Sequence, residues 1–193
     1  MRFGRAIVAS KNPDKIAEVE AVLAGLGIVD EIVRGLDWPD VDETEPTLEG
    51  NALLKARAVA AATGLVSVAD DTGLEVDALG GAPGVHSARY AGTDASYSDN
   101  VAKLLAELGD RSDRTARFRT VIAVVDPTTG HEWTAAGALE GEIAREQRGV
   151  YGFGYDPVFA VDGRTLGEMT KEEKSEISHR ARALRTLADV LAT

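Results

Sequence analysis

The stretch "RAIVASKNPDKIAEVEAVLAGLG", residues 5–27, places a strand pattern directly before a helix pattern. The apolar run within 5–10 predicts a short buried strand, and apolar residues at helical spacing predict a helix after it. Asn12 stands at the N-cap position, Pro13 at the first helical position, and Gly27 after the last helical residue. A strand that leads at once into a helix is typical of α/β proteins.

The rest of the chain continues this alternation without repeats, low-complexity segments or a linker. We expect a helix that begins at the Thr170 capping box and carries its apolar face to Leu191. A turn at 127–130 joins two strands as a hairpin, which argues against a purely parallel sheet. The sequence therefore predicts a mixed α/β fold in one domain over 1–193. The other expected elements are helices at 48–63 and 100–108, strands at 65–69, 115–126, 132–137 and 156–161, and a long loop at 80–94.

Composition bounds the class of protein. The chain has 193 residues, 44% of them hydrophobic and 27% charged, which is typical of a soluble globular domain. The net charge of −11 argues against a general affinity for nucleic acid or anionic membranes. The absence of cysteine excludes disulfides, thiolate zinc sites and a cysteine nucleophile. We find no signal peptide and no apolar run of membrane-spanning length, and we expect a cytoplasmic protein.

The segment "SKNPDK", residues 10–15, is a candidate phosphate-binding loop. A loop between a strand and a helix directs free backbone N–H groups and the positive end of the helix dipole toward one point. Ser10, Lys11, Asn12 and Lys15 add hydroxyl, ammonium and amide donors there. The segment is not a Walker loop. In the structural alternative, the asparagine only caps the helix and the lysines belong to a solvated face.

Two adjacent aspartates, Asp70 and Asp71, stand where the strand predicted at 65–69 ends. Neighbouring carboxylates near an apolar interior repel each other and are costly to desolvate, so a compensating cation is expected. One of them can hold Mg²⁺ or act as a general base toward water. In the alternative, an aspartate caps a turn through its own backbone. Further carboxylates from the acidic stretch 40–51 could join them: Asp42, Glu43 or Glu49.

The segment "GVYGFGYDP", residues 149–157, interleaves aromatic residues with glycine. Aromatic residues make up only 5% of the chain, so this concentration is unusual. Aromatic faces with glycines that permit close backbone approach suit a planar ligand. The alternative, which this segment alone favours slightly, is a turn with core aromatics.

The segment "TKEEKSEISHRARA", residues 170–183, brings Lys174, His179 and Arg180 to or near a helix start. Together these side chains could hold phosphate and donate hydrogen bonds to an oxygen on a base. A helix of mixed charge is also commonly just a solvated face.

These motifs in this order resemble the inosine triphosphate pyrophosphatase family, house-cleaning enzymes that act on non-standard purine nucleoside triphosphates. The resemblance covers nearly the whole chain. Ser10 and Thr72 stand where many members carry the other hydroxyl residue, which keeps the chemistry. The matching stretches are "SxNxxK" from Ser10, "ADDTGL" at 69–74, "GAPGVHSARYAG" at 81–92, "FGYDP" at 153–157 and "KEEKSEISHR" at 171–180.

The resemblance implies cleavage of ITP, dITP or XTP between the α and β phosphates, giving the monophosphate and pyrophosphate. It implies that Asp71 accepts the proton of the attacking water and that Asp71 and Glu43 bind Mg²⁺. The substrate-binding residues that it implies are Ser10, Lys11, Asn12, Pro13, Asp14, Lys15, Thr72, Phe153, Gly154, Tyr155, Asp156, Lys174, His179 and Arg180. A triphosphate approaching so acidic a chain would need local cations, which these lysines, the arginine and Lys55 can supply. We expect Asp70 to be held by neighbouring donors rather than to face substrate.

The same resemblance implies an α/β fold with a long mixed sheet, helices and two lobes around a central nucleotide-binding cleft. It also implies a homodimer. Two other functions compete with this interpretation. A phosphatase with an aspartate nucleophile of the haloacid-dehalogenase type needs D-x-D with a hydroxyl two residues further on, and "DDTG" has the wrong spacing. A nucleotide-binding protein without catalysis would not need the carboxylate at Asp71 together with a metal partner.

Overall fold

The computed structural model describes residues 1–192 and shows a mixed α/β protein. Its helices are α1 (Pro13–Leu26), α2 (Leu48–Thr63), α3 (Tyr97–Leu108), α4 (Lys171–Ile177) and α5 (His179–Ala192). Its strands are β1 (Phe3–Val8), β2 (Val29–Ile32), β3 (Val66–Val76), β4 (Pro83–Gly84), β5 (Thr115–Val125), β6 (Glu132–Ile143), β7 (Phe159–Val161) and β8 (Arg164–Thr165).

The strands form one mixed sheet within the described residues. Its order is β2-β1-β3-β5-β6-β7-β8, and β4 pairs with β3. β1 runs parallel to both β2 and β3, with Ala6 opposite Val66 in the second pairing. β6, β7 and β8 pair antiparallel. The long mixed sheet predicted for the chain is confirmed.

The chain divides into two compact units. Unit 1 comprises 1–71, 120–137 and 179–193, and unit 2 comprises 72–119 and 138–178. The long strands β3, β5 and β6 therefore contribute residues to both units. A single functional domain and a central cleft stay predictions. Among the described residues, no helix is both long enough and apolar enough to cross a membrane.

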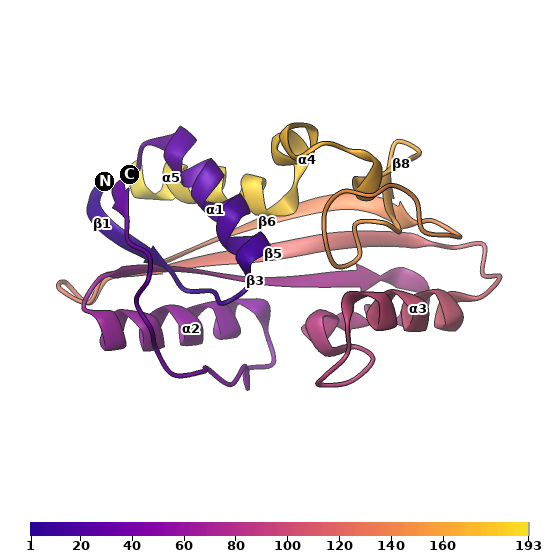
Figure 1. The fold of residues 1–193 in the computed structure, drawn as a ribbon, viewed down its shortest axis with the longest axis horizontal. Coiled ribbons are helices and arrows are strands. Elements are labelled where there is room, and N and C mark those ends of the chain that lie inside the picture. Colours follow the sequence, from indigo (N-terminus) through magenta and orange to yellow (C-terminus); the bar gives the residue numbers. More distant parts are fainter. Residues whose placement is uncertain (193) are drawn as a thin grey trace. The chain divides into compact units, whose positions relative to one another are not determined.

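In unit 1, helices cover both faces of the sheet: α1 and α5 lie side by side on one face, and α2 lies on the other (Figure 1). Because successive side chains of a strand point to opposite faces, each strand contributes to two cores. The core under α1 and α5 contains Val8 and Val68. The core against α2 contains Ala9 and Ala69. This alternation decides where the next two residues of β3, both aspartates, point.

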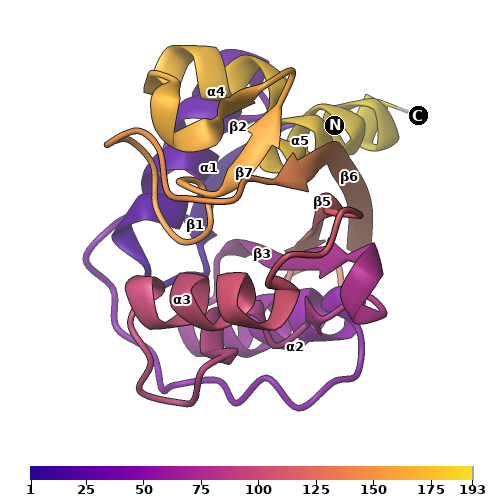
Figure 2. The same cartoon turned by 90° about the vertical axis from the view of Figure 1, so that its right-hand side faces the viewer.

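Unit 2 has its own apolar core. It is formed by a set of strand and helix residues that includes Leu74, Leu104, Phe118 and Phe159. Figure 2 shows α3 on one side of the strands of this unit and α4 on the other. α3 begins at Tyr97, earlier than the predicted 100, because Ser96 and Asp99 form a capping box.

Three predicted strand boundaries were wrong. β3 does not end before the aspartates but runs on to Val76, because Leu74 and Val76 enter the core of unit 2. β6 likewise extends beyond 137 to Ile143. β7 begins at Phe159 rather than 156, because the residues before it form turns.

The C-terminal helix predicted from Thr170 to Leu191 is in fact two helices. The Thr170 capping box is present, with Glu173 as its partner. Ser178 then adopts an extended conformation with φ −60° and ψ 148°, which ends α4 before α5 begins at His179. Helical spacing alone does not reveal this break, since the apolar positions continue in phase on both sides.

Candidate active site

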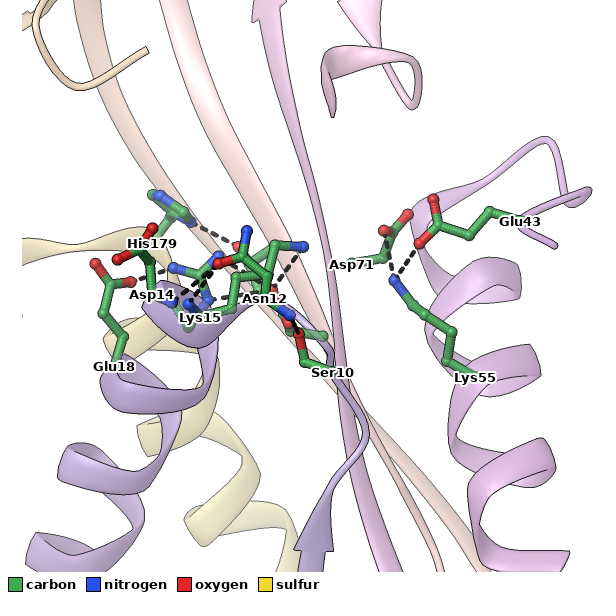
Figure 3. Close-up of polar contacts among 12 residues, drawn as sticks. Ser10, Asn12, Asp14, Lys15, Glu18, Glu43, Lys55, Asp71 and His179 are labelled. Atoms are coloured by element: carbon green, nitrogen blue, oxygen red, sulfur yellow. Dashed lines mark hydrogen bonds and ion pairs between the residues drawn. The ribbon is translucent and has the colours of Figure 1, made fainter. Parts of the chain in front are cut away.

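Asp71, Lys55 and Glu43 form a compact charged group in unit 1 (Figure 3). The Lys55 Nζ lies 2.9 Å from Asp71 Oδ1 and 2.6 Å from Glu43 Oε1. Asp71 comes from β3, Lys55 from α2, and Glu43 from the segment before α2. The Lys55 ammonium therefore stands between the two carboxylates.

Asp71 is buried, and one of its two carboxylate oxygens is unpaired. Its Oδ2 has no hydrogen-bond partner among the described residues. Burial raises the pKa of the Asp71 carboxyl, Lys55 opposes this, and the negative charge of Glu43 adds to it, with a net upward shift. A buried, unsatisfied carboxylate oxygen is costly, and such groups are typical of catalytic or ligand-binding sites.

These residues fit a magnesium ion. Mg²⁺ is commonly held by one or two protein carboxylates together with substrate phosphates and water, and the free Asp71 Oδ2 is such a ligand. No group of three or more His, Cys, Asp or Glu side chains suited to a metal occurs within residues 1–192, so an all-protein cage is not formed. Of the acids in 40–51, Glu43 lies nearest to this arrangement, because it shares Lys55 with Asp71. Glu49 instead accepts a hydrogen bond from Thr134, and Asp42 is exposed.

Asp70 has a different environment on the opposite face of β3. Its Oδ2 accepts hydrogen bonds from Arg180 Nε at 3.1 Å and Nη2 at 3.0 Å, and Lys15 Nζ lies 3.4 Å away. Arg180 is 2% exposed and also pairs with Glu18 of α1. Burial would raise the pKa of Asp70, but the surrounding cations, Lys15 and Arg180 foremost, hold it well below its usual range. The expectation that neighbouring donors hold Asp70 is confirmed.

The candidate phosphate loop is organised by Asn12. Its Oδ1 accepts the backbone N–H groups of Asp14 and Lys15, which caps α1, and its own N–H donates to Ser10 Oγ. The predicted cap is confirmed, and it uses two of the amide donors that a phosphate would otherwise meet. Lys11 is exposed and bonds Asp40 at 2.6 Å. Phosphate binding by this loop stays a prediction.

His179 is placed by the break before α5. It is 3% exposed, and its Nδ1 lies 2.6 Å from Thr120 Oγ1. Gly137 makes this packing possible, because an added Cβ would lie 2.4 Å from the His179 carbonyl oxygen. The ligand-binding roles predicted for His179 and Arg180 stay predictions, since both side chains are buried in polar contacts of the protein itself.

Unit 2 holds the residues predicted for the base and sugar. Asp156 Oδ2 accepts the Phe153 backbone N–H at 2.8 Å and Lys174 Nζ at 2.6 Å. The same ammonium lies 4.7 Å from the centre of the Phe153 ring. Asp156 thus holds the backbone of the half-buried Phe153, and Lys174 contacts its ring. The Phe153 ring also contacts Tyr97.

Other residues of this segment have structural roles. Tyr155 is 5% exposed, and its hydroxyl donates to the Ser87 carbonyl at 2.9 Å, so it belongs to the core of unit 2. Gly152 has φ +75°, and a Cβ there would lie 2.1 Å from Asp156 Oδ2. The glycines therefore allow the backbone to fold over the aspartate. Base contacts by Phe153–Asp156 stay a prediction.

Sequence reasoning missed two contacts. Lys55 was expected only as a phosphate cation, because nothing local in a helix that also carries Glu49 and Arg57 signals its two carboxylate partners. Glu18 was not considered, since it looks like any exposed helix residue and its partner Arg180 is 162 positions away. Thr72 follows Asp71 in β3 and is half-buried.

The chain belongs to the Ham1 family, whose model matches residues 6–190. It is similar to the dITP/XTP pyrophosphatase of Symbiobacterium thermophilum, with 53% identity over 93% of this chain and 91% of that protein. It is also similar to the dITP/XTP pyrophosphatase of Bacillus subtilis, with 45% identity over 96% of each chain. A solved Ham1 protein from Coxiella burnetii has 42% identity and a TM-score of 0.87, and the match covers 98% of both chains.

Proposed function

We propose that this protein hydrolyses dITP, ITP and XTP to the nucleoside monophosphate and pyrophosphate, which removes these nucleotides from the pool. Family membership and the full-length similarity to dITP/XTP pyrophosphatases support the substrate class. The observation that carries the chemistry is the buried Asp71 Oδ2 without a partner, beside Lys55 and Glu43. This oxygen is a proton acceptor that no other group of the described residues occupies.

In the proposed reaction, Asp71 accepts the proton of the water that attacks the α phosphorus, and pyrophosphate leaves. A general base works best when its pKa lies nearer the working pH, and burial shifts the pKa of Asp71 in that direction. Lys55 keeps the carboxylate oriented through Oδ1, which leaves Oδ2 open toward the ion and the attacking water.

The phosphate groups need local positive charge in a chain of net charge −11. We assign this role to Lys11, Lys15 and the N-terminus of α1, whose dipole favours anions. Lys15 is already drawn to Asp70, which fixes its ammonium next to β3.

Asp71 and Glu43 would hold the proposed Mg²⁺. When bound, the ion neutralises phosphate charge and makes water more acidic. The residues proposed for base and sugar are Phe153 to Asp156, with Lys174. A purine with an oxygen at position 6 would accept hydrogen bonds from donors that adenine's amino group cannot satisfy. A homodimer and a cytoplasmic location are also proposed, on the sequence resemblance alone.

The test is product analysis with dITP, XTP, GTP and ATP, each with Mg²⁺ and with EDTA. We expect rapid, Mg²⁺-dependent release of pyrophosphate from dITP and XTP, and weak release from GTP and ATP. Orthophosphate as the product would contradict cleavage at the α phosphorus. Tight binding of XTP without turnover would instead support a nucleotide-binding protein without catalysis.

A further inference from the structure

A charged pocket lies in unit 2 and is not used by the proposed function. It has a volume of about 440 Å³ and is formed where β6 ends and the β7–β8 turn passes. Its charged lining consists of Arg114, Arg145, Arg148, Glu142 and Glu146. None of these residues belongs to the predicted catalytic, phosphate or base-binding sets.

Arg114 is held rigidly at this pocket. It is 8% exposed and donates to three backbone carbonyls: Ile143, Gly109 at 3.1 Å and Ala144 at 3.0 Å. All three acceptors are neutral, so its charge is not matched by a carboxylate. Burial lowers the pKa of Arg114, as does the nearby positive charge of Arg145, while Glu142 acts in the opposite direction.

The other two guanidinium groups also keep donors available. Within residues 1–192, Arg145 makes no hydrogen bond or ion pair. Arg148 donates from Nη2 to the Gly163 carbonyl at 3.0 Å, but its buried Nε has no hydrogen-bond partner, and Glu168 lies 3.7 Å from it. By contrast, Arg57 of α2 is matched by two 2.7 Å bonds to Glu132.

Guanidinium groups that lie close together repel one another, and an anion bound among them removes this repulsion. Guanidinium groups bind the oxygens of phosphoryl groups in paired, charge-assisted hydrogen bonds. The pocket lining contains no aromatic side chain that could stack a base. We infer that the pocket bounded by Arg114, Arg145 and Arg148 binds a free inorganic phosphoryl anion, either phosphate or pyrophosphate. The two glutamates of the lining limit how much negative charge it accepts.

The experiment uses the whole ¹⁵N-labelled chain in EDTA, at constant ionic strength, titrated separately with sodium phosphate and sodium pyrophosphate. We expect saturable shifts of the backbone amides of 142–148 and of Gly163. The anion that saturates at lower concentration identifies the natural source. Shifts of 10–15, if present, report the proposed active site separately, so failure of one site does not affect the other.

The decisive variant is Arg145→Gln, because Arg145 is exposed and its replacement breaks no hydrogen bond or ion pair within residues 1–192. Loss of one charge-assisted contact predicts binding that is weaker by about tenfold. Arg111→Gln is the matched control: it removes the same charge from an exposed residue outside the lining, and binding should not change. The inference is overturned if the 142–148 amides show no saturable shift with either anion, or if the two variants bind alike.

Discussion

Asp70 and Asp71 are chemically identical neighbours in β3, but their carboxylates lie in different environments and their pKa values shift in opposite directions. The pleat of β3 turns Asp70 toward α1 and α5 and Asp71 toward α2. On the first face, a guanidinium and an ammonium surround the carboxylate, and its pKa falls. On the second face, one lysine is shared with Glu43, an oxygen stays unpaired, and the pKa rises. The helix that each carboxylate faces thus decides whether cations surround it or one of its oxygens stays unpaired.

The comparison predicts its largest effect for Asp71→Asn. An amide cannot accept the proton of the attacking water, so pyrophosphate release should fall by about 10²- to 10⁴-fold. The protein should remain folded, since the change removes a buried charge. Steady-state pyrophosphate release measures the loss of activity, and thermal unfolding followed by circular dichroism checks that the variant is folded. Wild-type turnover by this variant would exclude Asp71 as the base.

Arg180→Met tests the other face. It leaves Asp70 and Glu18 without their main cation in the interior, and removing one partner of a buried ion pair costs about 3–5 kcal/mol in the free energy of unfolding. Urea denaturation measures this loss.

A double-mutant cycle with Asp70→Asn provides the control for Arg180→Met. Because the two residues are in contact, their effects should not add. Additive losses would show that Arg180 stabilises the fold through contacts other than Asp70.

Gly137→Ala probes the packing that places α5 over its face of the sheet. A Cβ at Gly137 would lie 2.4 Å from Ala183 N and from the His179 carbonyl, so α5 must move. Overpacking of this kind costs about 1–3 kcal/mol in unfolding free energy. Gly4→Ala in β1 is the matched control, since a Cβ there meets nothing within 4 Å. Equal stability of the two variants would mean that α5 shifts freely.

The smallest loss of stability is expected when the N-caps of α1 and α2, the helices on the two faces of the sheet, are removed. Asn12→Ala removes the acceptor for two N–H groups of α1, and Thr47→Ala removes the acceptor for Gly50 N of α2. Each should cost about 1 kcal/mol of stability. Only Asn12→Ala should also raise KM for XTP, because it disorders the proposed phosphate loop. An equal rise in both variants would point to stability alone.

Much of the local structure was predictable. α1 and α2 begin and end as expected, because their caps, prolines and glycines are local signals. The single C-terminal helix was wrong, since Ser178 breaks it without interrupting the apolar spacing. The end of β3 was also wrong, because polar residues within a strand look like its boundary until both faces are known to be covered.

The candidate site shows the same division. The sequence by itself determined that two carboxylates follow an apolar run, that a capped helix follows a polar loop, and that the chain is acidic, because these are matters of composition and short-range spacing. The tertiary structure decided that Lys55 bridges Asp71 and Glu43 and that Arg180, 110 positions away, neutralises Asp70. Such partners depend on which helix packs on which face of the sheet, and that is settled only when distant segments share a core.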